Sequence, residues 1–155
     1  RLLGIRGQTA LVLDRCGKIV ASAEMPGFAS RSDEGEGFYI YEIEQVDGST
    51  TSGMLDESFQ EIIPAGTYSF IDRMDDWTGG ERKAYPFLRC GKDLNGTTMF
   101  DICDLTGNVI IPNVSRVFDV GSDRFAVGKG FDVGLMDEKG NWIVKRSIFT
   151  ELDDE

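Results

Sequence analysis

Short apolar runs alternate with polar turns along the whole chain, and one pattern recurs four times. In each copy an apolar pair precedes an aspartate, two variable residues and usually a glycine follow, and a run rich in β-branched residues comes next. The four copies are residues 11–20, 53–64, 101–112 and 134–145. Such short apolar runs are typical of strands. No stretch keeps a 3.6-residue apolar period, so the pattern predicts little helix.

The aspartate and the glycine of each copy predict a hairpin turn. An aspartate that opens a type I turn accepts a hydrogen bond from the backbone two residues on, and a glycine three positions later adopts the left-handed conformation. In the second copy Phe59 stands in place of the glycine. Pro64 and Pro112 are expected to end the returning strand, because proline cannot donate to a ladder. The residues assigned to structural turns are Asp14, Gly17, Asp56, Asp104, Gly107, Asp137 and Gly140.

An apolar segment downstream of each of the first three hairpins predicts a third strand, and another such segment precedes the first hairpin. These segments are residues 2–5, 38–43, 87–90 and 125–127. We therefore expect an all-β fold of one domain, residues 1–155, in which four units of a hairpin plus a third antiparallel strand stack as a twisted array. The approximate units are residues 1–44, 45–92, 93–128 and 129–155. A solenoid-like array and a partial barrel or propeller arc both remain open, and the chain is expected to be a segment of a longer one.

The repeat resembles that of the WG (KWG-type) β-repeat proteins of bacteria. Their unit reads approximately Trp-Gly-aromatic-Ile-Asp-x-x-Gly-x-Val-Ile-Pro, followed by Tyr-Asp and a Phe-x-x-Gly-Leu-Ala-x-Val segment. The matching positions are Asp104, Gly107, Val109, Ile110, Pro112, Phe118, Asp119, Val120, Phe125, Ala126, Val127, Gly134, Asp137 and Gly140. The signature tryptophan is replaced by Ala10, Ser52, Phe100 and Val133, so these repeats are divergent. The resemblance implies a non-enzymatic array that serves binding or scaffolding, and it brings no catalytic residues.

The amino-acid composition argues against several classes of function. The 155 residues hold 27 acidic and 16 basic side chains, a net charge of −11, and no histidine. Histidine bases, Ser-His or Cys-His pairs and histidine metal ligands are therefore excluded, and we expect no enzyme. The negative charge opposes nucleic-acid binding, and no apolar run approaches the roughly 20 residues of a membrane span.

The cysteines and aspartates give no sign of a metal or a cofactor. Cys16, Cys90 and Cys103 are odd in number and lack a C-x-x-C spacing, so we expect unpaired thiols. The turn aspartates do not fit a calcium-loop pattern. Unpaired thiols lean slightly toward a cytoplasmic protein, with a secreted or envelope-attached one nearly as plausible.

One segment, residues 72–85, concentrates carboxylates and aromatic rings. Its candidates for ligand or partner contact are Asp72, Asp75, Asp76, Trp77, Glu81 and Tyr85. Arg73, Arg82 and Lys83 lie in the same segment, so a solvated loop that neutralises itself is the competing interpretation.

The predicted function is a scaffold that presents a surface to a protein or a polysaccharide. The alternative is a carbohydrate-binding module in which Trp77 or Tyr85 stacks on a sugar. A remote alternative is a glycoside hydrolase, which needs two carboxyl groups about 5–9.5 Å apart. Exposed sheet edges allow a monomer or weak self-association.

Overall fold

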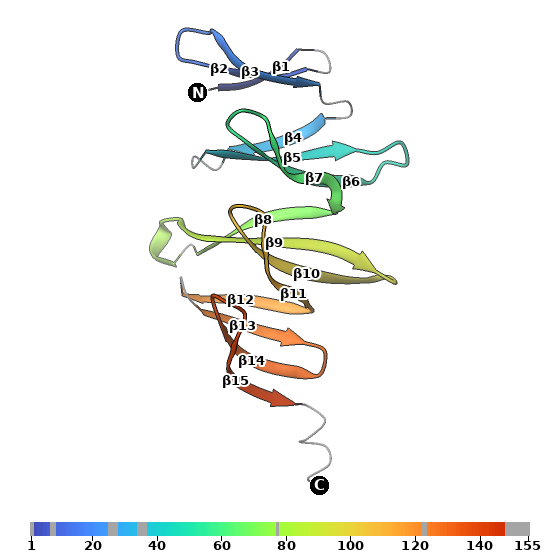
Figure 1. The fold of residues 1–155 in the computed structure, drawn as a ribbon, viewed down its shortest axis with the longest axis vertical. Coiled ribbons are helices and arrows are strands. Elements are labelled where there is room, and N and C mark those ends of the chain that lie inside the picture. Colours follow the sequence, from blue (N-terminus) through green and yellow to red (C-terminus); the bar gives the residue numbers. More distant parts are fainter. Residues whose placement is uncertain are drawn as a thin grey trace. The chain divides into compact units, whose positions relative to one another are not determined.

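The protein is all-β, as the repeat pattern predicts. A computed structural model describes residues 2–6, 9–24, 28–33, 37–76, 78–121 and 124–147. Within these residues fifteen strands form four antiparallel sheets, and one short 3-10 turn, Thr78–Gly80, is the single helical element (Figure 1). Each sheet ends in two edge strands, so none of the described sheets closes into a barrel.

The sheets follow one another along the chain. The first contains β1 (Leu2–Arg6), β2 (Thr9–Leu13) and β3 (Ile19–Glu24). The second contains β4 (Phe28–Asp33), β5 (Phe38–Glu44), β6 (Thr50–Asp56) and β7 (Glu61–Tyr68). The third contains β8 (Phe70–Asp76), β9 (Lys83–Leu94), β10 (Thr97–Asp104) and β11 (Val109–Val114). The fourth contains β12 (Arg116–Gly121), β13 (Arg124–Lys129), β14 (Asp132–Asp137) and β15 (Trp142–Ser147).

The four repeat copies form the hairpins β2/β3, β6/β7, β10/β11 and β14/β15. Each apolar segment pairs with the hairpin that follows it, as β5 does with β6 and β9 with β10. Tight turns cause this order, since Asn95 and Gly96 both have positive φ and join β9 to β10 in a two-residue loop. The sheets consequently begin and end at other residues than the predicted units.

Two local predictions are wrong. The segment 72–85 is not a loop throughout, because its first residues lie in the strand β8 and its last residues lie in β9, and the third sheet therefore has four strands. Pro64 and Pro112 lie inside β7 and β11 and do not end them. Both prolines are exposed on edge strands beside register shifts, where the ladder does not need their missing N–H group.

The chain divides into two compact units, Arg1–Ile71 and Asp72–Glu155. In the N-terminal unit the first and second sheets share a core. Its buried members are Ala10, Val12, Tyr39, Tyr41, Leu55 and Phe59. Apolar side chains on alternate strand positions thus cover one sheet with the next.

The C-terminal unit repeats this arrangement with the third and fourth sheets. Its buried members are Met74, Tyr85, Phe87, Ile102, Ile111, Val114, Val117, Phe125, Val127 and Met136. The rings of Phe87 and Phe125 meet edge to face, with centroids 4.8 Å apart at 79°. One face of the fourth sheet is therefore buried against the third sheet, and its other face points away from this core.

Candidate functional site

The fourth sheet carries an apolar strip on the face away from the core. Strand pairing places Ala126 opposite Leu135 and Leu135 opposite Val144, and Val133 lies on the same face because it shares the parity of Leu135. We call Ala126, Val133, Leu135 and Val144 the outer strip. Val133 is 45% exposed and Val144 is 56% exposed. Two large apolar side chains on one sheet face are therefore open to a partner.

A shallow hollow of about 220 Å³ lies at the outer strip. Its walls are Arg116, Ala126, Val127, Gly128, Val133 and Gly134, and they are almost entirely apolar. Gly128, which lies opposite Val133, leaves room here because it places no side chain over the outer face. A hollow with few polar atoms suits an apolar side chain of a partner better than a sugar, whose hydroxyl groups need hydrogen bonds.

Arginines border the outer strip. Arg146 is directly opposite Val133, Arg116 is opposite Gly128, and Arg124 is on the same face beside Asp137. All three arginines are exposed. A protein with a net charge of −11 thus gathers positive charge around its exposed apolar strip.

The structure places the acidic residues of segment 72–85 beside basic ones. Asp75 forms an ion pair with Arg82 Nε at 2.8 Å, and Asp72 lies 3.8 Å from Arg89. Glu81 is exposed. Trp77 and the side chain of Asp76 lie outside the described residues.

Tyr85 does not have the exposure that sugar stacking needs. It is 5% exposed in the core of the C-terminal unit, and its backbone carbonyl accepts a hydrogen bond from Arg73 Nε. The ring packs among the core side chains of the C-terminal unit and does not line the hollow at the outer strip. The expectation that Tyr85 stacks on a sugar is therefore wrong.

The carboxylates of the four turn aspartates accept hydrogen bonds from the backbone of their own hairpin turns. In each turn Oδ1 accepts a hydrogen bond from the backbone N–H two residues on at 2.8–2.9 Å. The same atom accepts a second bond from the N–H four residues on at 2.9–3.0 Å. Gly17, Gly107 and Gly140 have φ near +80°, and Phe59 takes the same place with φ 63°. These residues lie at separate hairpin turns.

Protonation at acid pH should destabilise a turn whose aspartate carboxylate accepts hydrogen bonds. Burial raises the pKa of Asp104, but hydrogen bonds from Thr106 and Asn108 outweigh it, so the folded pKa lies below its ordinary 3.8. This contribution to stability is present above pH 3.8 and is lost as the pH falls through the lower folded pKa. We expect Asp104→Asn, which cannot titrate, to flatten the fall in urea midpoint between pH 4 and pH 2. An unchanged slope would contradict this assignment.

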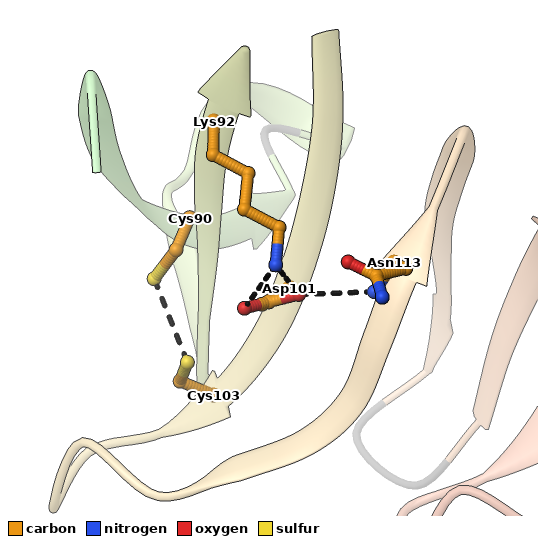
Figure 2. Close-up of polar contacts among 5 residues, drawn as sticks. All are labelled: Cys90, Lys92, Asp101, Cys103 and Asn113. Atoms are coloured by element: carbon orange, nitrogen blue, oxygen red, sulfur yellow. Dashed lines mark hydrogen bonds and ion pairs between the residues drawn. The ribbon is translucent and has the colours of Figure 1, made fainter. Parts of the chain in front are cut away.

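A buried polar cluster spans β9, β10 and β11 (Figure 2). Asp101, which is 5% exposed, accepts hydrogen bonds from Lys92 Nζ at 3.0 Å on both oxygens. Its Oδ1 also accepts the backbone N–H of Asn113 at 2.9 Å. The cluster ties the three strands together, and sequence reasoning did not identify it.

Cys90 and Cys103 lie beside this cluster with their sulfur atoms 3.7 Å apart (Figure 2). Both are buried, Cys16 is exposed, and none of the three forms a disulfide. The hydrogen bond to Cys103, burial, and the charges of Asp101 and Asp72 raise the pKa of Cys90 well above its usual value. A thiol held neutral is a poor nucleophile and a poor metal ligand. No metal-binding group of three or more acidic or thiol side chains occurs in the described part of the chain.

Comparison with known proteins gives a partial match. Residues 81–155, somewhat less than half of the chain, are similar to a family described as a domain of unknown function (DUF5046). No curated protein and no solved structure matches the chain. The matched segment contains the outer strip. In the described residues no helix is long and apolar enough to cross a membrane.

Proposed function

We propose that the protein is a non-enzymatic β-repeat scaffold of the WG type that binds protein through the outer strip of the fourth sheet. The observation that carries this proposal is the exposure of Val133 and Val144 on one face of the fourth sheet, where Leu135 lies opposite Val144. Scattered exposed apolar residues are normal, whereas adjacent ones beside a hollow are typical of binding surfaces.

Stacking of sheets supports the repeat-array part of the proposal. In each compact unit one sheet covers the next through apolar alternate positions. A repeat that buries its faces against its neighbours extends as a solenoid-like array, in which an uncovered end face is the place for the next layer. The outer strip has the composition of such a face.

The occupant that we propose is a second copy of this chain. Arg116, Arg124 and Arg146 border the strip, and the chain as a whole carries an excess of acidic side chains. A second copy therefore offers carboxylates to those arginines, and two copies of the strip itself would set arginine against arginine. Charge favours a contact between unlike surfaces of the two copies.

Sedimentation velocity tests the proposal with the intact chain. At about 0.5 mM, which populates complexes with dissociation constants between μM and mM, we expect dimers or larger species. Val144→Lys adds a charge to the strip and should leave only monomer. Added salt should weaken the association of the wild type, because arginines contribute to it.

Val109→Lys is the matched control. Val109 is 48% exposed on β11, outside the strip, so the variant makes the same chemical change at another exposed valine. It should associate as the wild type does. A wild type that stays monomeric at this concentration, or equal dissociation of both variants, would overturn the proposal.

A further inference from the structure

The N-terminal unit contains a pocket that is independent of the outer strip. It has a volume of about 170 Å³. This is below the roughly 300–1,000 Å³ of sites for drug-sized ligands, so the pocket admits a head group or one side chain. The residues on which the argument rests are Glu24, Tyr41, Leu55, Phe59 and Glu61, which all line it.

Phe59 forms one wall of the pocket, and its backbone has an unfavourable conformation. Its φ is 63°, in the left-handed region, where the other three hairpins have Gly17, Gly107 and Gly140. A bulky residue in this region is an outlier, and such outliers gather at functional sites. The ring is buried and meets Tyr39 edge to face, with centroids 6.0 Å apart. The second hairpin thus has an aromatic side chain at a backbone position where glycine would be unstrained.

Tyr41 forms another wall, and its place depends on a glycine. It is directly opposite Gly53, and a Cβ added to Gly53 would stand 2.4 Å from the Tyr41 hydroxyl oxygen. The ring therefore lies against the backbone of β6. Burial, together with the negative charge of Glu61, raises the pKa of Tyr41 above its ordinary value. Tyr41 and Glu61 both line the pocket.

Among the residues whose side chains the structure describes, two carboxylates and no basic side chain line the pocket. Glu24 ends β3 and Glu61 begins β7, and both are exposed. Thr9 Oγ1 donates a hydrogen bond of 3.1 Å to Glu24 Oε1, which holds this carboxylate at the end of β3. The walls between the two acids are apolar or aromatic. A metal ion would need six or more oxygens, which these residues do not supply, and an anion would be repelled.

We propose that this pocket binds the head group of an organic cation, either a primary alkylammonium such as a lysine side chain or a trimethylammonium group. Aromatic walls attract such cations through the ring quadrupole, and carboxylates at the entrance add charge attraction. The carbon atoms of the head group can pack against these apolar walls. The same walls cannot replace the water molecules that surround a small inorganic cation.

Isothermal titration of the intact chain with choline and with n-butylammonium tests the proposal. We expect saturable binding with a dissociation constant in the mM range for at least one of them. Tighter binding of n-butylammonium assigns the site to a lysine side chain, and tighter binding of choline assigns it to a quaternary ammonium. The uncharged carbon analogue of choline, 3,3-dimethyl-1-butanol, should bind at least about tenfold more weakly.

Variants tie the binding to this pocket. Glu61→Gln, an exposed and nearly isosteric change, should weaken binding about fivefold to tenfold. Phe59→Gly restores the residue of the other hairpins and should abolish binding while circular dichroism confirms the fold. Glu138→Gln removes an exposed carboxylate from the β14/β15 turn and should change nothing. The absence of saturable binding, equal binding of the uncharged analogue, or equal losses in Glu61→Gln and Glu138→Gln would overturn the proposal.

Discussion

Replacement of Asp101 by alanine should lower the free energy of unfolding by about 3–5 kcal/mol, the usual cost of breaking a buried ion pair from one side. Asp101 accepts two hydrogen bonds from Lys92 and one from the backbone N–H of Asn113. With the carboxylate gone, the half-buried ammonium of Lys92 and a backbone donor lose their acceptor together. Urea denaturation followed by tryptophan fluorescence measures the change.

A double-mutant cycle separates the two partners of Asp101. In a Lys92→Met background no buried cation is left without its acceptor, so Asp101→Ala should cost only the about 1–3 kcal/mol of the unsatisfied N–H of Asn113. A loss below about 1 kcal/mol for Asp101→Ala alone would show that the cluster does not hold β9, β10 and β11 together.

Replacement of Gly134 by alanine should destabilise the protein by about 3 kcal/mol, at the upper end of the cost of overpacking. A Cβ at Gly134 would stand 1.9 Å from the carbonyl oxygen of Val144 and 3.1 Å from the Cα of Lys145. These are backbone atoms of the neighbouring strand, so a side-chain rotation cannot relieve the contact. β15 must move away from β14, and the register shift beside Leu135 must change. Thermal unfolding followed by circular dichroism measures the effect.

Gly128→Ala is the matched control for Gly134→Ala. Gly128 lies on the adjoining strand β13, and its added Cβ would meet side-chain atoms, namely the Ser115 hydroxyl at 3.3 Å, the Arg116 Cβ at 3.8 Å and the Val133 Cγ1 at 4.0 Å. We expect a change within about 0.5 kcal/mol, as for most exposed substitutions. Equal effects at the two glycines would contradict the close approach of β15 at Gly134.

The hairpins were predictable because their chemistry is local. Asp104 and Gly107 form one turn within four residues, and the structure shows the hydrogen bonds that the spacing implies. The strand pairing was less accessible, since it depends on loops such as Asn95-Gly96 that join the apolar segment to the next hairpin. Asn-Gly between apolar runs is a strong hairpin signal, and it could have placed β9 beside β10.

The exposed face of the fourth sheet could not be predicted from local pattern. Val127 and Val133 are both apolar strand residues, but Val127 packs in the core while Val133 is exposed. Only the position of the third sheet against the fourth decides which face is covered. The expectation that Tyr85 contacts a ligand failed for the same reason. Its burial depends on contacts with residues distant in sequence, which the local pattern does not show.

The most direct test of the scaffold is a dilution series of methyl NMR spectra of the intact chain. Between about 0.5 mM and about 20 μM, a range that spans weak self-association, we predict shifts for the methyl groups of Ala126, Val133, Leu135 and Val144. The methyl groups of the exposed control Val109 should not move. Shifts that instead appear at Val109 and other residues of the edge strand β11, or spectra that do not change on dilution, would contradict the outer strip as the protein-binding surface.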